Sequence, residues 1–298
     1  MILYILYRIG IFFALALPVR ASYFMACRLA DAYCLLSPSD RAAVIGNMRV
    51  VTGGSKSDGE LSAMARGVFR NFAKYLVDFF RQSRIDADYI KKFVKVEGRE
   101  HVDEALTRGK GVIMLSAHIG NWELGGAIVA MLGYPLSAVV LAHGNKKING
   151  LFRGQRLISS MVPIEIGASL KECYRVLKAN KCLALMGDRD FTKNGLTSEL
   201  FGKNARIPRG PAVFAYRLAS AVVPAFMVRE ADDTFRLVFE EPLFADASKD
   251  EASSVEELMK RYVAVMEAYI RKYPTQWYAF KSIWERDAEE DMRPDTII

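Results

Sequence analysis

The chain has 298 residues, of which 51% are hydrophobic and 25% are charged, and its formal net charge is +7. This composition excludes a disordered chain, and the length allows one large or two small domains. The positive charge favours an acidic partner, but no arginine-rich run, zinc-finger spacing or aromatic RNA-binding motif supports a nucleic acid. Three histidines without an H-E-x-x-H motif argue against a metal site. The lack of G-x-S-x-G, Walker and G-x-G-x-x-G motifs argues against a serine hydrolase, a nucleotidase and a dinucleotide enzyme.

Residues 1–19 are apolar apart from Arg8 and are about long enough to cross a bilayer. Three interpretations remain open: a transmembrane anchor, a helix lying in the membrane interface, or a buried N-terminal helix. If the segment spans, the basic residues that follow place the rest of the chain in the cytoplasm. We therefore expect residues 1–36 to form membrane-associated helices and residues 37–298 to form a single domain.

Two helices should follow this segment. The first covers residues 40–52, and the second begins at a capping box formed by Ser57 and Glu60. The second helix carries a cluster of aromatic side chains that could line an acyl groove, although packing in the core is the simpler interpretation. These side chains are Phe69, Phe72, Tyr75, Phe79 and Phe80.

From residue 93 onward, strand and helix patterns alternate. Strands are expected over 93–96, 111–117, 136–141, 162–166 and 182–186, and helices over 101–108, 121–132, 146–158 and 169–180. Such alternation predicts an α/β fold with a mostly parallel central sheet flanked by helices.

The remainder of the chain is predicted as follows. Residues 191–202 should form a loop, and 212–219 a helix. Strands 222–228 and 235–239 form a hairpin that closes the sheet, with Pro224 indicating an edge or irregular position. A capping box of Ser254 and Glu257 begins a final helix that ends before Pro274.

A histidine stands where the strand over 111–117 ends, which is the usual place for a ligand site in an open α/β sheet. His118 can take a proton from a hydroxyl near neutral pH. Glu123, in the first turn of the next helix, can hold the imidazole in one tautomer if His118 lies before that helix. The alternative is a strand-end histidine that merely caps the helix.

The segment AHIGNWELGG around these residues resembles the H-x4-[D/E] motif of the lysophospholipid acyltransferase superfamily. The asparagine-tryptophan-glutamate version is similar to the branch of lipid A lauroyl and myristoyl acyltransferases and phosphatidylinositol mannoside acyltransferases. The resemblance continues through MGDRD, FGKNARIPRGPAVFAYR and PTQWYAF, and covers roughly residues 40–284.

The resemblance implies further substrate-binding residues. Asn121 and Trp122 lie in the central motif, and the inward arginine of the helix over 146–158 matches Arg156 best, with Arg153 as second choice. A solvated basic face is the alternative for these two arginines. Asp188 either orients the histidine or pairs with Arg156, and Arg189 binds the headgroup; a purely structural ion-pair network is the alternative.

An anion site is also expected at the start of the helix over 212–219. Arg206 and Arg209 stand beside this helix N-terminus, before Gly210. The family usually has threonine or serine where Arg209 stands, so the contact made there is open. Trp277, in PTQWYAF, is expected to pack in the core.

The resulting hypothesis is a membrane-associated O-acyltransferase on the cytoplasmic face of the inner membrane. His118 and Glu123 are the catalytic pair, and backbone N–H groups near Gly120 and Asn121, or a nearby basic side chain, stabilise the oxyanion. The acyl thioester of an acyl carrier protein or coenzyme A is the donor and a lipid A precursor is the acceptor. The basic surface meets an anionic membrane, and neither a cofactor nor a metal is expected. The alternatives are a glycerophospholipid or phosphatidylinositol mannoside acyltransferase, and a non-catalytic lipid-binding protein.

Overall fold

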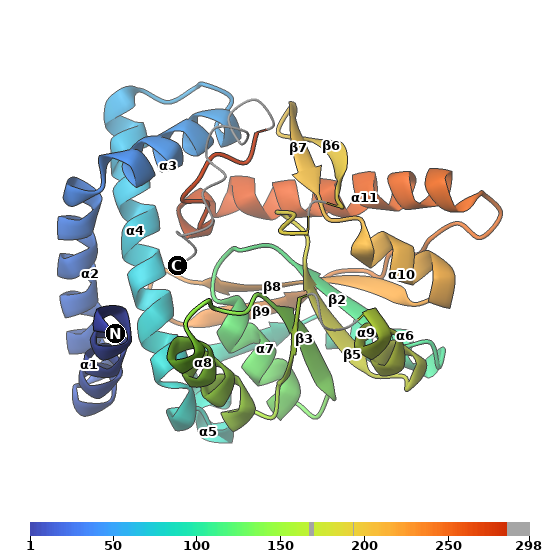
Figure 1. Ribbon diagram of the computed structural model, residues 1–298, viewed down its shortest axis with the longest axis horizontal. Helices are drawn as coiled ribbons and strands as arrows, with labels where there is room; N and C mark the ends of the chain where they lie inside the picture. The colour runs from blue at the N-terminus through green and yellow to red at the C-terminus, as the bar shows by residue number, and fades with distance from the viewer. Residues whose placement is uncertain (167–169, 193, 285–298) are drawn as a thin grey trace.

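The computed structural model describes residues 1–166, 170–192 and 194–284, and a seven-stranded sheet lies at its centre (Figure 1). The order of strands across this sheet is β1-β9-β8-β2-β5-β3-β4. Their bounds are β1 Val94–Glu97, β2 Val112–Ser116, β3 Leu136–Val140, β4 Val162–Glu165, β5 Cys182–Met186, β8 Ala221–Arg229 and β9 Phe235–Phe239.

Five neighbouring strands of the sheet run parallel, from β8 through β2, β5 and β3 to β4. β9 pairs antiparallel with β8, and β1 pairs parallel with β9. The expected α/β fold with a mostly parallel sheet flanked by helices is confirmed. The predicted hairpin of β8 and β9 forms, but it does not close the sheet, because β1 lies beyond β9.

Helices cover both faces of the sheet because β2 is apolar on both sides. Ile113 and Leu115 belong to one buried cluster, and Val112 and Met114 to the other. Helices α9 Leu170–Lys178, α10 Gly210–Leu218 and α11 Glu251–Lys272 contact the first face, and α6 Arg99–Thr107 and α7 Trp122–Met131 contact the second. The remaining helices are α3 Pro38–Val51, α4 Asp58–Phe80, α5 Ala87–Phe93 and α8 Lys146–Ile158, with short 3-10 turns η1 Gln82–Arg84 and η2 Pro274–Gln276.

The N-terminal residues form two helices, α1 Ile2–Ala16 and α2 Val19–Leu36, which lie beside α4 at one side of the molecule (Figure 1). Pro18 is the N-cap of α2, so the apolar run of residues 1–19 is not one continuous helix. Arg81, the C-cap of α4, and Arg84, in the turn η1, donate hydrogen bonds to the last carbonyl groups of α1, where a helix favours cations. Within the described residues, no helix has both the length and the apolarity needed to cross a membrane.

Several local predictions can be compared with the structure. The capping box of Ser57 and Glu60 is confirmed at the start of α4. Four aromatic residues of the α4 cluster are buried and Phe72 stacks on one of them, Tyr75, as expected of core residues. The predicted start of the helix over 169–180 and the C-terminal residues 285–298 of the predicted domain lie outside the described residues.

The loop predicted over 191–202 is wrong in its second half. β6 Leu196–Leu200 and β7 Lys203–Ile207 form an antiparallel hairpin whose two-residue turn is Phe201 and Gly202. Both turn residues have positive φ, at 54° and 75°, as the tightest hairpin turns require.

Pro224 was expected at an edge or at an irregular position of the sheet, and the edge is wrong, because β8 is a central strand. Pro224 is tolerated because it stands where pairing with β2 ends and pairing with β9 begins. The final helix begins at Glu251, not at Ser254. Asp250 is its N-cap and accepts a hydrogen bond from the backbone of Ser253, so Ser254 lies within the helix and is buried.

Candidate active site

The proposed catalytic histidine lies at the carboxyl end of the sheet, where β2 and β5 end side by side. Ser116 pairs with Met186 in the register of these parallel strands. His118 lies two residues after Ser116, and Asp188 lies two residues after Met186. The segments that leave the two strands therefore bring the two side chains together. The predicted charged cluster at the end of β5 therefore faces the histidine directly.

The loop that carries His118 is held by backbone hydrogen bonds on both sides. The carbonyl oxygen of His118 accepts from the backbone N–H of Tyr278 at 2.9 Å, and Gly120 N–H donates to the carbonyl of Gln276 at 2.9 Å. Gly120 has φ +64°, and a Cβ there would lie 1.9 Å from the carbonyl oxygen of Met227. Only glycine fits this turn, which separates the imidazole from the helix that follows.

A chain of hydrogen bonds orients the imidazole. His118 Nδ1 lies 2.7 Å from Asp188 Oδ1, and Trp277 Nε1 donates to Asp188 Oδ2 at 3.0 Å. A carboxylate can only accept, so Nδ1 carries the proton and Nε2 presents its lone pair. Asp188 and Trp277 are buried, whereas 18% of the His118 side chain is exposed. The arrangement is a base held in one tautomer, with its free nitrogen available to a substrate.

The electrostatic environment keeps this base neutral. Burial lowers the pKa of His118, and the charge of Arg189 lowers it further. Burial alone would raise the pKa of Asp188, but the charges of His118 and Arg189 and the hydrogen bonds from His118 and Trp277 outweigh it and lower that pKa overall. An ionised carboxylate beside a neutral imidazole is the state that can accept a hydroxyl proton.

The prediction that Glu123 holds the imidazole is wrong. The Glu123 carboxylate forms a buried two-pronged ion pair with Arg156 on α8, with Oε2 at 3.0 Å from Nε and Oε1 at 2.5 Å from Nη2. Burial lowers the pKa of Arg156, but the charge and hydrogen bonds of Glu123 outweigh it and raise that pKa. Glu123 lies on the helix beyond the Gly120 turn, so it acts on His118 through its charge alone.

The N–H groups predicted to form an oxyanion hole are already occupied. Gly120 N–H bonds Gln276, and Asn121 N–H donates to the carbonyl of Met227 at 2.7 Å. The nearby basic side chain, the other option, is Arg189. Its Nε is buried, lies 3.5 Å from Asp188 Oδ2 and has no hydrogen-bond partner within the described residues. Arg189 therefore places a buried N–H and a positive charge beside Asp188.

Aromatic side chains line the histidine. The Trp122 ring meets the imidazole edge-on with centroids 5.1 Å apart and stacks on Tyr75 at 4.4 Å. Phe191, whose side chain is 41% exposed, meets the imidazole from another side at 6.0 Å. Tyr278 packs against both Trp122 and Tyr75. Such a wall suits an apolar substrate next to the reacting group.

Several of the other predicted binding residues have partners of their own. Arg153 is exposed on α8, whereas Arg156 of the same helix points inward. Arg206 donates to the Gly195 carbonyl at 3.2 Å, and Arg209 is the N-cap residue of α10, which begins at Gly210. Asn121 is buried, and its side chain caps α7 by accepting from Leu124 N–H. The structure thus joins His118, Trp122, Asp188 and Arg189, and the anion site at the start of α10 stays a prediction.

Sequence reasoning missed the polar role of Trp277 and the position of Phe191. The signal for Trp277 was present, since PTQWYAF is one of the segments that carry the family resemblance, but only packing was expected of it. Its indole N–H reaches Asp188 because Trp277 pairs with Ile119 in an isolated antiparallel bridge beside the catalytic loop.

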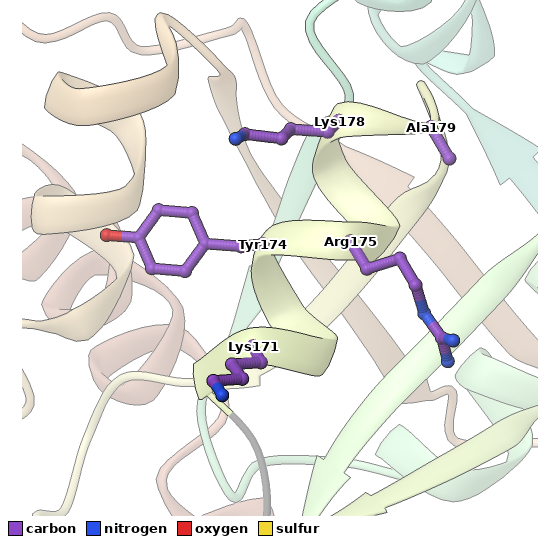
Figure 2. Close-up of a pocket in the computed structure, with 5 residues that line it drawn as sticks. All are labelled: Lys171, Tyr174, Arg175, Lys178 and Ala179. Carbon is purple, nitrogen blue, oxygen red and sulfur yellow. The ribbon is translucent and has the colours of Figure 1, made fainter.

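A separate open hollow of about 600 Å³ lies on α9. It is lined by Lys171, Tyr174, Arg175, Lys178 and Ala179, so that three of its five residues are basic (Figure 2). Tyr174 and Lys178 point to one side of the helix and Arg175 to the other (Figure 2). These residues are not those around His118, so the hollow is a surface feature distinct from the active site.

The comparisons with known proteins agree with this geometry. The family described as bacterial lipid A biosynthesis acyltransferase matches residues 1–286. The chain belongs to this family. The acyltransferase is 24% identical over 234 residues to the phosphatidylinositol mannoside acyltransferase of Mycolicibacterium smegmatis, covering 77% of this chain and 75% of that protein. It is also 24% identical over 216 residues to the lipid A biosynthesis palmitoleoyltransferase of Escherichia coli, covering 70% and 67%.

The acyltransferase is therefore an enzyme of the lipid A and phosphatidylinositol mannoside type. A third relative, the phosphatidylinositol mannoside acyltransferase of Mycobacterium tuberculosis, is 23% identical over 229 residues and covers 75% of this chain and 71% of its own.

Proposed function

We propose that this acyltransferase moves an acyl chain from the thioester of an acyl carrier protein or coenzyme A to a hydroxyl of a lipid A precursor at a membrane surface. The observation that carries the proposal is the hydrogen-bonded chain from Trp277 through Asp188 to His118, at the carboxyl end of the sheet. It supplies a neutral, oriented base beside an aromatic wall, which is what proton removal from a lipid hydroxyl needs.

The proposed reaction has two steps. His118 Nε2 takes the acceptor hydroxyl proton while the oxygen attacks the thioester carbonyl, and Arg189 stabilises the oxyanion with its buried Nε. The tetrahedral intermediate then collapses, the C–S bond breaks, and the imidazolium returns the proton to the leaving thiolate. Asp188 and the charge of Glu123 both favour the imidazolium that forms between these steps.

The donor is proposed to be acidic. A net charge of +7 and the basic face of α9 favour a partner that carries phosphate or carboxylate groups. Both an acyl carrier protein and coenzyme A meet this condition.

The membrane is proposed to receive the apolar faces of α1 and α2. Large hydrophobic side chains on these helices point to solvent. Elsewhere in the described chain, exposed large hydrophobic side chains are scattered. The most exposed of those on α1 and α2, at 56% or more, are Met1, Ile2, Leu6, Phe12, Phe24, Leu29, Leu35 and Leu36. A short helix with such a face suits insertion at the interface rather than across the bilayer.

A second acceptor class is supported by a specific observation. The phosphatidylinositol mannoside acyltransferase of Mycolicibacterium smegmatis matches the chain over a longer stretch than the lipid A palmitoleoyltransferase does, 234 residues against 216. Both acceptors present sugar hydroxyl groups on an anionic lipid, so the same site chemistry serves either.

The test compares lipid pools and turnover in wild type, His118→Ala and His101→Ala. His101 is a matched control, because its ring bonds the Phe239 carbonyl at 3.0 Å, outside the active site. We expect His118→Ala to remain folded and to lose turnover by a factor on the order of 10² or more, and His101→Ala to keep it. Mass spectrometry should show one added acyl chain with wild type only.

The mass of the acylated lipid identifies the acceptor. Acylation of a phosphatidylinositol mannoside instead of a lipid A precursor would select the second class. Full turnover in His118→Ala would reject the base assignment.

A further inference from the structure

Behind the catalytic loop lies a fully buried polar cluster made by four separate elements. Its members are Tyr23 of α2, Asp78 of α4, Asn121 at the start of α7 and Arg229 at the end of β8, each at most 8% exposed. The Asp78 carboxylate accepts hydrogen bonds from Tyr23 Oη, from Arg229 Nη2, and from Asn121 Nδ2 at 2.8 Å. Arg229 Nη1 in turn donates to Tyr23 Oη at 3.1 Å.

This cluster is bonded to the loop that carries His118. Asn121 joins the two, because its Nδ2 donates to Asp78 while its Oδ1 accepts from Leu124 N–H at 3.1 Å and so caps α7. The Asn121 backbone N–H reaches Met227, two residues before Arg229. Moving Asp78 would therefore displace the residue at which the catalytic turn becomes a helix.

A second connection runs through Gln276. Its side chain accepts from Arg229 N–H at 2.9 Å and donates to the Arg229 carbonyl at 2.8 Å, so it bonds both backbone polar groups of that residue. Its own carbonyl accepts from Gly120 N–H. The same residue thus ties the guanidinium-bearing strand end to the glycine turn beside His118.

The chemistry of the cluster indicates that it orients the elements that meet there, and does not merely stabilise the fold. A buried ion pair is weak support for stability, because apolar residues of similar volume often serve as well. A fully bonded polar network does fix directions, since every donor and acceptor must keep its partner. Four elements that meet at one carboxylate are thereby held at defined angles next to the reacting group.

We propose that Tyr23 is a positioning residue, acting through Asp78 and Asn121, so that the packing of α2 sets the placement of His118. The inference rests on the proposed role of His118 as the base. It assigns the N-terminal helices a part in catalysis, separate from their apolar outer face.

The test uses Tyr23→Phe, Asn121→Ser and their double variant in the full-length enzyme. Phenylalanine keeps the ring but loses both hydrogen bonds, and serine can still cap α7 but is too short to reach Asp78. Tyr33→Phe is the matched control, since Tyr33 also lies on α2 and donates to an aspartate, Asp40, at 2.8 Å, but on the surface.

We expect kcat to fall about fivefold in Tyr23→Phe and about tenfold in Asn121→Ser with KM for both substrates unchanged, because small misplacements of a catalytic group cost rate rather than binding. The double variant should fall about tenfold, not fiftyfold, because both changes break one pathway. Tyr33→Phe should match wild type. The imidazole nitrogen NMR signals of His118, among only three histidines, should shift in the first two variants and not in the control.

Three results would overturn the inference. They are unchanged kcat in Tyr23→Phe, multiplicative losses in the double variant, or losses that track melting temperature alone with unshifted His118 signals. Failure of the proposed function is recognised separately, because His118→Ala would then keep its turnover whatever the Tyr23 variants do.

Discussion

At the scale of single residues, the geometry shows which carboxylate bonds the imidazole of His118. The H-x4-E spacing favoured Glu123, but Asp188 lies 70 positions along the chain and holds Nδ1 at 2.7 Å. Spacing in the sequence cannot show this contact, because it depends on the pairing of Ser116 with Met186 between two parallel strands. The sequence predicts only that charged residues follow β5, and it allows Asp188 two roles, to orient the histidine or to pair with Arg156.

Neutralising Asp188 and neutralising Glu123 should have different effects, the first on turnover and the second on stability. Asp188→Asn should remain folded but lose kcat by a factor on the order of 10² or more, because the imidazole loses its tautomer and the support for its charge. Glu123→Gln leaves Arg156 buried without a counter-ion, which should cost stability by about 3 to 5 kcal/mol. Kinetics and thermal unfolding of both variants check this, and a larger kcat loss with a smaller stability loss in Glu123→Gln would contradict it.

The pH dependence should report the lowered pKa of His118. The base must be neutral to accept a proton, so kcat/KM should rise with pH and reach half of its plateau below about 6.5, the value of an unperturbed histidine. Arg189→Met removes a positive charge that lowers this pKa, so the midpoint should move to higher pH. Burial, the larger cause, remains. Rate profiles of wild type and variant test the sign, and a shift to lower pH would refute it.

At the scale of elements, regular apolar patterns were predictable and context-dependent ones were not. Cys182–Met186 and Lys146–Ile158 have the predicted bounds, because a buried strand and an amphipathic helix each show their period. β6 was missed, because Leu196–Leu200 is largely polar and its turn places Phe201, not the usual asparagine, at positive φ. The position of Pro224 could not be predicted, because it lies where pairing with β2 ends and pairing with β9 begins, and this depends on the tertiary structure.

The start of α11 offers a stability test at this scale. Asp250→Ala removes the N-cap side chain that accepts from Ser253 N–H at 3.1 Å, which should destabilise the enzyme by about 1 kcal/mol. The melting temperature should fall by about 2 °C. Glu257→Ala should have a smaller effect, because Glu257 pairs with exposed Lys249 and does not cap the helix. A larger loss of stability in Glu257→Ala than in Asp250→Ala would instead support the capping box of Ser254 and Glu257.

At the scale of the whole molecule, the apolar helices α1 and α2 lie apart from the basic helix α9. The exposed hydrophobic side chains of α1 and α2 lie at one side of the sheet and the basic helix α9 lies at the other (Figure 1). Composition predicted the positive charge and the apolar N-terminus, but not this separation, which follows from the chain path. In the proposed function, the side with α1 and α2 meets the lipid surface and the side with α9 meets the acidic donor.

Membrane binding should therefore depend on the apolar faces of α1 and α2 and not on apolar exposure elsewhere, and substitutions in α1 test this. Leu6→Asp with Phe12→Asp replaces two side chains that are 56% and 65% exposed. Burying each in lipid is worth about 1.5 kcal/mol or more, so binding to phosphatidylglycerol vesicles should weaken by about 10²-fold in a sedimentation assay. Leu170→Asp, on α9 and 72% exposed, is the control and should bind as wild type does. Equal loss in both proteins would mean that general hydrophobicity, rather than the N-terminal face, holds the enzyme on lipid. Unchanged binding in the α1 variant would remove that face from the membrane altogether.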